Sequence, residues 1–221
     1  MVYFFPLGCL TFIFLILLLP FLFLLGYFHI LTIGFEKLGI SPQATFFLLL
    51  AILIGSSINI PLGRKKIFMK EEKFLFGLFR IKKPHVQGVS INLGGAIIPI
   101  LLSFYLLYQS WSRGFNLQPI LMATLLMIIL AKRLARIVPG IGISLPVLIP
   151  PLFSALLALV FTPNFAAPTA FIAGTLGTLI GADILNLKRV QKYGGVVSIG
   201  GAGVFDGIFL VGIISALLTG I

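Results

Sequence analysis

The chain contains only two aspartates, Asp183 and Asp206, and both lie in strongly apolar stretches, whereas its three glutamates lie in more polar segments. A carboxylate inside a bilayer is costly to insert, so an aspartate there is by default a sign of function. Two carboxyls that lie close together cannot both stay charged at little cost, and the pair shares one proton. Such a pair can activate water, or it can bind a proton or a cation.

Three roles for the two aspartates follow from these residue types. As a catalytic dyad, they would activate water for peptide hydrolysis, one as base and the other as acid. In a transport pathway, they would bind a proton or a cation. As structural residues, they would cap a broken helix or accept hydrogen bonds from backbone groups beside Asn186 or Ser198. The dyad is our first hypothesis, because both carboxyls reach a similar depth on neighbouring antiparallel segments if the last helix begins near Gly203.

The composition indicates which elements must position these aspartates. Hydrophobic residues make up 59% of the 221-residue chain and charged residues only 10%, whereas soluble domains carry roughly 25% charged residues. A membrane-spanning helix needs about 20 apolar residues, so the length allows seven spans with short loops. We therefore predict one all-α transmembrane bundle over residues 1–221, located in the cell membrane. The predicted spans are 5–32, 44–62, 90–109, 118–137, 143–162, 168–187 and 195–218.

The distribution of Lys and Arg predicts the orientation, because cytoplasmic loops carry an excess of these residues. All of them except Lys37 and Arg113 lie in the loops after the second and sixth predicted spans or in the basic end of the fourth, where that span runs into its loop. A seven-span topology with the N-terminus inside and the C-terminus outside places all three basic loops in the cytoplasm. The longest of them, residues 63–89, is expected to be a solvated basic loop, with its FLFGLFR portion as a candidate interfacial segment.

Two interrupted regions predict a cavity or a pathway. Residues 139–151 are rich in proline and glycine, and irregular backbone is tolerated at membrane depth only when it is buried in protein or faces a water-filled cavity. Six spans plus a re-entrant segment is therefore the alternative to seven spans.

Asn59 and Asn92 each end a Ser-Ile-Asn sequence near the end of a span. Such a position is typical of transporter sites but also of hydrogen bonds between helices. The candidate residues lining a substrate site or pathway are Asn59, Asn92, Asn186, Gly201 and Gly203.

The remaining residue types give no metal or cofactor site. Cys9 is the only cysteine, and the two histidines are far apart in the sequence, so we expect no metal centre. No glycine-rich phosphate loop ends in Lys-Ser or Lys-Thr, so we expect no nucleotide cofactor.

The basic residues behind the net charge of +11 lie in short clusters between apolar runs. Their expected partner is the anionic lipid surface rather than nucleic acid. The basic residues expected to face lipid are Arg136, Lys188 and Arg189; the other expected partners are a transmembrane peptide or a small ion.

Four sequence elements resemble those of an uncharacterised family of prokaryotic multi-pass membrane proteins, a domain of unknown function, over most of the chain. They are NLGGAIIP, IVPGIGISLP, GADILNL and GGAGVFDGIF. This resemblance implies a membrane protein and supplies no activity.

A second resemblance concerns the two aspartates alone. Asp183, together with Asp206 after a glycine-rich entry, is similar to the catalytic aspartates of presenilin, signal peptide peptidase and prepilin peptidase type intramembrane proteases. It implies water-dependent peptide cleavage, with Gly201 and Gly203 shaping the second site. The chain departs from those proteases in three places. Two extra residues precede Asp206 in the Gly-x-Gly-Asp motif, Ala182 replaces the tyrosine of presenilin-like members, and no Pro-Ala-Leu element follows Asp206.

Overall fold

The computed structural model describes residues 26, 29–63, 66–74, 79–138, 142–146, 148–191, 195–201 and 207–219. Most of the first predicted span therefore lies outside the described residues. The same holds for two candidate site residues, Gly203 and Asp206.

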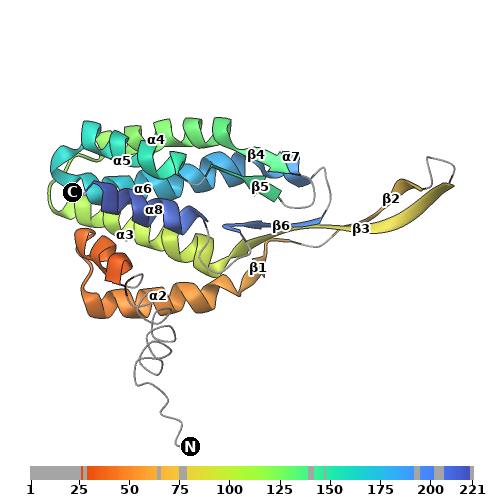
Figure 1. The fold of residues 1–221 in the computed structure, drawn as a ribbon, viewed down its shortest axis with the longest axis horizontal. Helices are drawn as coiled ribbons and strands as arrows, with labels where there is room; N and C mark the ends of the chain where they lie inside the picture. The colour runs from red at the N-terminus through yellow and green to blue at the C-terminus, as the bar shows by residue number, and fades with distance from the viewer. Residues whose placement is uncertain are drawn as a thin grey trace, which may run out of the picture.

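The described chain is mostly helical, and its main helices pack side by side (Figure 1). Helix α6 is at the centre, because it packs against α3, α4, α5 and α8 and nearly all of its residues are buried. A helix that is buried on all sides belongs to the interior of a bundle. The helices are α2 (Pro42–Ser56), α3 (Ile98–Ser112), α4 (Leu117–Leu134), α5 (Ile149–Phe161), α6 (Ala166–Thr178), α7 (Leu187–Gln191) and α8 (Gly207–Leu218).

Local sequence sets where several of these helices begin. Ser41 caps α2, since its hydroxyl accepts a hydrogen bond from the Ala44 amide, and Pro42 occupies the first turn, where a missing N–H does no harm. Asn116 caps α4 in the same way through the Gln118 amide. These caps follow tight turns, and both turns lie at the end of the bundle opposite to the sheet (Figure 1).

Three helical segments are long and apolar enough to cross a membrane: Leu93–Ser112, Leu117–Leu134 and Pro163–Gln191. A fourth is counted if the helix His29–Lys37 and α2, which meet at a bend of 113°, form one broken span. Two shorter apolar helices, Ile149–Phe161 and Ile208–Leu218, lie beside them. The prediction of a mostly helical membrane protein is confirmed at this level.

The prediction of an all-α fold is wrong at one end of the bundle, where four strands form a sheet. Strand β3 pairs antiparallel with β1 and β2 and parallel with β6, and the register places Asn59 opposite Asn92 and Ser90 opposite Ser198. The predicted solvated loop 63–89 is instead largely a β-hairpin that extends away from the helices (Figure 1). The strands are β1 (Asn59–Pro61), β2 (Lys66–Phe74), β3 (Phe79–Asn92) and β6 (Gly195–Ile199).

Strands also replace the helical ends of several predicted spans. Residues 136–138 belong to strand β4 (Arg136–Val138), which pairs with β5 (Gly142–Ser144), so the fourth predicted span ends early at Leu134. The fifth is non-helical before Ile149, as its prolines and glycines predicted. The seventh predicted span begins as β6, and its described helix is α8 from Gly207.

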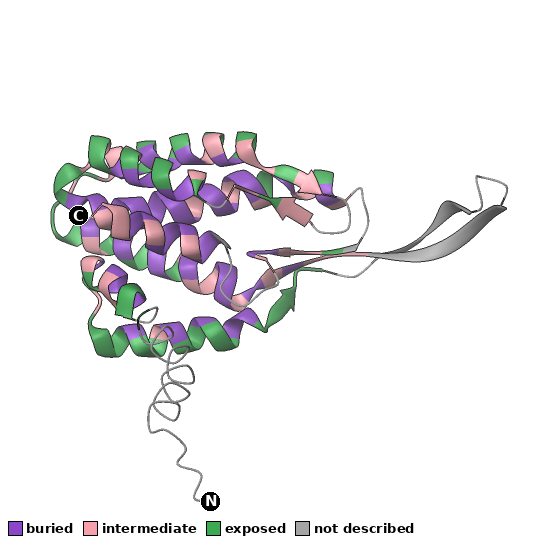
Figure 2. Cartoon of the chain, viewed as in Figure 1, coloured by how far each residue is buried: buried purple, intermediate pink, exposed green. Residues whose placement is uncertain are grey.

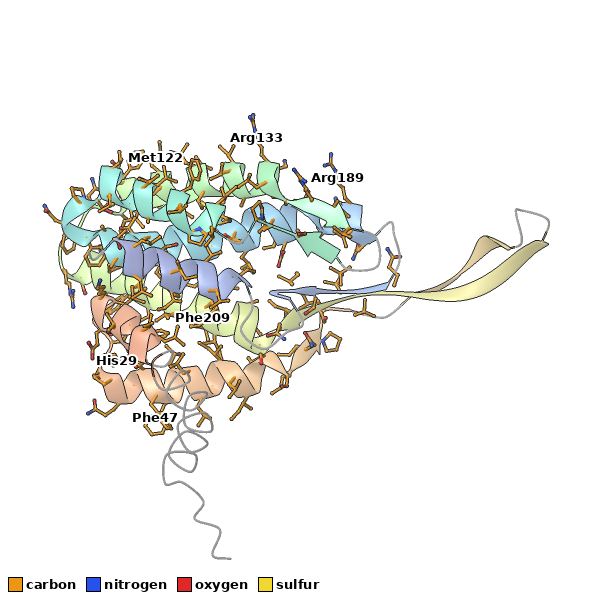
Figure 3. The ribbon with its side chains drawn as sticks, in the orientation of Figure 1. His29, Phe47, Met122, Arg133, Arg189 and Phe209 are labelled. Carbon is orange, nitrogen blue, oxygen red and sulfur yellow. The ribbon has the colours of Figure 1, made fainter. Side chains whose placement is uncertain are left out.

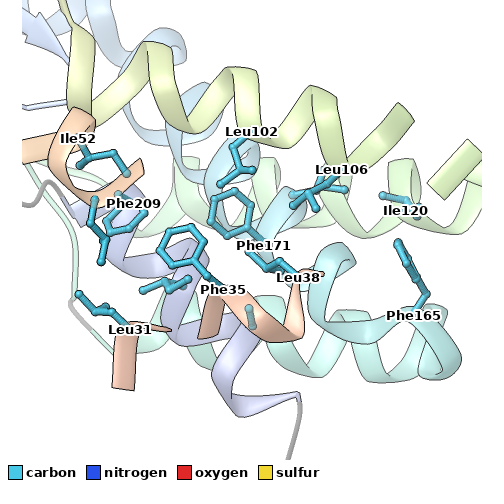
Figure 4. Close-up of a cluster of buried hydrophobic side chains, with 14 residues drawn as sticks. Leu31, Phe35, Leu38, Ile52, Leu102, Leu106, Ile120, Phe165, Phe171 and Phe209 are labelled. Carbon is cyan, nitrogen blue, oxygen red and sulfur yellow. The ribbon is translucent and has the colours of Figure 1, made fainter. Parts of the chain in front are cut away.

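The core and the surface have the pattern of a membrane protein (Figure 2). Phe35 and Phe209 stack with ring centroids 5.9 Å apart, in a cluster that also buries Phe171 (Figure 4). Large apolar side chains such as Phe47 and Val160 are exposed on the outside of the helices. Lipid accepts such a surface, whereas water would penalise it.

Glycines allow the helices around α6 to approach closely. A Cβ on Gly177 would overlap the Met127 side chain of α4, and one on Gly181 would overlap the Ile128 carbonyl oxygen. On the other side of α6, a Cβ on Gly212 of α8 would overlap the Thr175 hydroxyl.

Candidate functional site

Asp183 lies where the central helix meets the sheet. It ends a π-helical turn, η3 (Leu179–Asp183), that continues α6. Its Oδ2 atom accepts a hydrogen bond of 2.9 Å from the backbone N–H of Gly200, which follows strand β6. π-Helical turns are uncommon and are found often at functional sites. The carboxyl is therefore held at the boundary between two elements that are distant in the sequence.

Asn186 supports the turn that carries Asp183. Its side-chain amide is buried and donates hydrogen bonds to the carbonyl oxygens of Gly181 (3.2 Å) and Ala182 (2.9 Å). The wider π-helical turn needs such partners, because buried carbonyl groups without donors are unfavourable. Asn186 thus has a structural role in fixing this segment.

The partner of Asp183 comes from a double-glycine turn. Gly200 and Gly201 both have positive φ angles, 82° and 72°, which side chains other than glycine rarely adopt. A Cβ on Gly200 would lie only 2.6 Å from Cβ of Ala96, so the turn also lies against the π-helical segment η1 (Leu93–Ile97). Conformation and packing both require glycine at position 200.

A small buried cluster joins the elements around this turn. Leu179 of η3, Ile199 of β6 and Ile208 of α8 pack together with Ala96 of η1. Leu179 lies one turn before Asp183, and Ile208 lies two positions after Asp206 in the sequence. Asp206 itself and Gly203 lie outside the described residues, so only one member of the predicted pair has a described position.

Asn59 and Asn92 lie in the same region, where a polar network joins the sheet to α2. The Asn92 side chain donates to the carbonyl oxygen of Ser56 (2.7 Å) and to Oδ1 of Asn59 (3.2 Å), and its own Oδ1 accepts from the Gly95 amide (2.7 Å). The Ser198 hydroxyl donates to the same Asn59 oxygen over 2.6 Å. Asn92 is fully buried. The hydrogen bond expected between the two asparagines is present, although strands rather than helices carry it.

The predicted lipid-facing cations are exposed at this end of the bundle. Arg136 opens strand β4, and Lys188 and Arg189 lie on α7. Figure 3 shows Arg133 and Arg189 pointing away from the helices. Their exposure fits contact with lipid headgroups or water, and no ion pair to Asp183 is formed among the described residues.

Sequence reasoning missed three buried hydroxyls on the central helix. The Oγ1 atoms of Thr169, Thr175 and Thr178 have no hydrogen-bond partner among the described residues. Other buried hydroxyls in the bundle, such as those of Thr124 and Ser103, donate to the carbonyl oxygen four residues earlier. The threonines of α6 could have been noticed because they recur in the same predicted span as Asp183.

The chemistry open to this site depends on one oriented carboxyl. Gly200 fixes Oδ2 of Asp183, and the second carboxyl oxygen has no protein partner among the described residues. A carboxyl in this state can exchange a proton with water or with a second carboxyl nearby. In the described part of the chain, no group of three His, Cys, Asp or Glu side chains could hold a metal ion.

A mostly helical membrane bundle with a sheet at one end, and an aspartate at their junction, defines the class of this protein. Residues 53–218 match the family described as "Protein of unknown function (DUF1614)", and the chain belongs to this family. The matched range includes both aspartates and all of the asparagines above. No curated protein matches the chain, and no solved structure matches it.

Proposed function

We propose that this protein is a diaspartyl intramembrane hydrolase, in which Asp183 and Asp206 activate water to cleave a transmembrane peptide. The observation that carries the proposal is the hydrogen bond from the Gly200 amide to Asp183 Oδ2. It connects the first aspartate to the glycine turn that leads, within six residues of sequence, to the second.

The packing of α8 against α6 supports the approach of the second carboxyl. The two helices are in close contact at Gly212 and Thr175, and Ile208 near the start of α8 packs with Leu179 near Asp183. Asp206 precedes Gly207, the first residue of α8, by one peptide bond.

The proposed reaction uses one proton shared by the two carboxyls. The ionised member takes a proton from water, whose oxygen forms a bond to the peptide carbonyl carbon. The protonated member donates its proton to the carbonyl oxygen, and the tetrahedral intermediate then loses the amine as the C–N bond breaks. One carboxyl gives its proton to the leaving amine, and the other carboxylate takes a proton back from a hydroxyl of the intermediate, so the dyad again holds one proton and the product is the carboxylic acid.

We further propose that the sheet end of the bundle faces the cytoplasm and that the chain crosses the membrane seven times. Every basic residue in the described part of the chain, except Lys37 and Arg113, belongs to a segment at the sheet end or to the hairpin. The positive-inside rule then places this end inside. A substrate would reach Asp183 near the cytoplasmic interface, where water is available.

Proton- or cation-coupled transport is the second candidate, because one observation favours it. The buried hydroxyls of Thr175 and Thr178 lack partners among the described residues, and they lie on the same helix as Asp183. Hydroxyls within the membrane normally bond to their own helix. Unpaired ones could carry a proton or contact a cation along α6.

The test of hydrolysis compares membrane proteomes from cells producing wild-type protein, Asp183→Asn, Asp206→Asn or the control Glu72→Gln. New peptide N-termini are enriched and sequenced. We expect termini inside transmembrane segments with the wild type and the control, and their loss with either aspartate variant. Cleavage must then be reproduced with purified protein and the identified peptide in liposomes. If the Asn variants produce the same termini as the wild type, or no termini depend on the protein, the hydrolase proposal is wrong.

The same variants test transport. Purified protein is placed in liposomes that contain a pH-sensitive dye, and proton flux is measured after a pH jump. A flux that is lost in Asp183→Asn, without any protein-dependent cleavage, would favour the transporter.

A further inference from the structure

A cavity of about 410 Å³ that is open to the outside lies between the start of α2 and the side of α3, and four of its six lining residues are exposed. Helices α2 and α3 touch closely at the sheet end, where Gly55 meets Gly94, and they diverge toward the opposite end (Figure 1). The cavity occupies this diverging region, far from the sheet. Its lining residues are Gly39, Ile40, Ser41, Ala44, Leu48 and Tyr105.

The rim of the cavity carries polar groups from the end of α3. A Cβ placed on Gly39 would lie 3.6 Å from Gln109 Nε2 and 3.7 Å from Arg113 Nη2, so both side chains border the lining. Gly39 has a φ of 78°, and this left-handed conformation brings the turn against them. The Oε1 atom of Gln109 is buried and has no hydrogen-bond partner among the described residues.

Two cations lie at this end of the bundle against the general charge pattern of the chain, and one of them, Arg113, borders the cavity. Lys37 and Arg113 are the two basic residues outside the three basic clusters. Lys37 lies in the same turn as Gly39, and its Nζ donates a long hydrogen bond of 3.4 Å to the Leu217 carbonyl oxygen. The exposed Glu36 beside it partly offsets the positive charge.

Exposed aromatic residues place the rim at the membrane interface. Tyr108 and Trp111 end α3 beside Arg113, with ring centroids 6.2 Å apart, and both are more than half exposed. Tyr and Trp side chains collect at the level of the lipid headgroups. The apolar lining therefore continues from headgroup depth toward the hydrocarbon.

We propose that this cavity binds an anionic phospholipid with a hydroxyl-bearing headgroup, of the phosphatidylglycerol type. Arg113 contacts the phosphate, Lys37 in the neighbouring turn adds to the positive charge of this end, and a headgroup hydroxyl donates to Gln109 Oε1. One acyl chain lies against Ile40, Leu48 and Tyr105. The apolar lining distinguishes a phospholipid from a free phosphate compound, which would gain nothing from it. This site is separate from Asp183 and does not depend on the proposed hydrolysis.

The test uses Trp111, which is the only tryptophan in the chain. Full-length protein is placed in nanodiscs that contain a small fraction of brominated phosphatidylglycerol or brominated phosphatidylcholine, and Trp111 fluorescence is recorded. Bromine quenches on contact, so we expect stronger quenching by phosphatidylglycerol. This selectivity should be lost in Arg113→Gln and Lys37→Gln and should increase in Glu36→Gln. Filling the cavity with Ala44→Leu should also remove it while every charge remains.

Matched controls and competing outcomes make the proposal falsifiable. Arg133→Gln and Lys188→Gln, at the sheet end, should leave the selectivity unchanged. Equal quenching by the two lipids, or selectivity that survives both Arg113→Gln and Ala44→Leu, would overturn the proposal. Relief of quenching by excess glycerol 3-phosphate would show a phosphate site without a lipid requirement. An oxidative cross-link between Ala44→Cys and the native Cys9 would show that the chain's own first residues cover the cavity, and the lipid proposal would be wrong.

Discussion

The backbone nitrogen of Gly200 lies 2.9 Å from Oδ2 of Asp183, and this contact joins the end of strand β6 to the end of the central helical segment. The two residues are 17 positions apart, and the intervening chain forms α7 and β6. The contact fixes one carboxyl and the first residue of the glycine turn together. The proposed dyad requires that the segment after this turn brings the Asp206 carboxyl close to the Asp183 carboxyl.

The first prediction is that residues 183 and 206 can be joined by a disulfide. In a Cys9→Ser background, Asp183→Cys and Asp206→Cys should cross-link readily on mild oxidation, because a disulfide requires Cα atoms within about 7 Å. The cross-link is measured by mobility on non-reducing gels and by mass spectrometry of the joined peptides. The control pair is Ile184→Cys with Asp206→Cys, since the Ile184 side chain is exposed on another side of the helix. Equal or absent cross-linking of the first pair would contradict the dyad.

The second prediction concerns the packing of the double-glycine turn. Gly200→Ala should destabilise the protein by about 2 to 4 kcal/mol, because it adds left-handed strain of about 1 to 2 kcal/mol and a steric overlap with Ala96. Gly114→Ala is the matched control: Gly114 has a similar φ of 78°, but a Cβ there would have nothing within 4 Å. Unfolding in mixed micelles gives the free energy of unfolding of both variants. If Gly200→Ala and Gly114→Ala lose the same free energy of unfolding, only backbone strain matters at position 200.

The third prediction separates a buried helix cap from an exposed one. Asn92→Ala removes the cap on the Gly95 amide and leaves the Ser56 carbonyl without its donor, so we expect a loss of about 2 to 3 kcal/mol. Asn116→Ala removes an exposed cap on the Gln118 amide and should lose only about 0.5 to 1 kcal/mol, because water replaces the side chain. The free energies of unfolding of both variants are compared in the same detergent. A loss for Asn92→Ala no larger than that for Asn116→Ala would show that the network adds little.

The helical part of the fold was predictable because apolar runs of sufficient length are bounded by polar turns, as at Arg113 and Asn116. The sheet was not predictable in the same way, because residues 90–92 of strand β3 lie directly before the apolar run of α3 and were assigned to the same predicted span. A short apolar run that is buried cannot be assigned to strand or helix from its composition. The pairing of β3 with β6 also joins residues about a hundred positions apart, and no local pattern encodes it.

The candidate site was predictable only in part for the same reason. Asp183 stood out because carboxylates are rare in apolar segments, and Asn59 and Asn92 stood out through their repeated context. Gly200 did not, since its role depends on the register of β6 and on the close approach of Ala96. Neither the strand register nor the contact with Ala96 can be predicted from the residues near position 200.

The last prediction tests a hydrogen bond between helices inside the bundle. The hydroxyls of Ser154 on α5 and Ser215 on α8 lie 2.5 Å apart and are fully buried. In a double-mutant cycle with Ser154→Ala and Ser215→Ala, we expect a coupling energy of about 0.6 kcal/mol and no more than about 1.7, the range for such bonds in membranes. The modest value follows because the Ser154 and Ser215 hydroxyls can also use the carbonyl oxygens of Pro150 and Val211 on their own helices.

Ser103 and Ser110 of α3 are the control pair for this cycle, because each hydroxyl donates to the carbonyl oxygen four residues earlier in its own helix. The changes in the free energy of unfolding caused by their two alanine substitutions should be additive within error. Unfolding in mixed micelles gives all of the free energies. Additive behaviour of Ser154 and Ser215 as well would mean that the contact between α5 and α8 is a consequence of close packing and not a bond that stabilises the bundle.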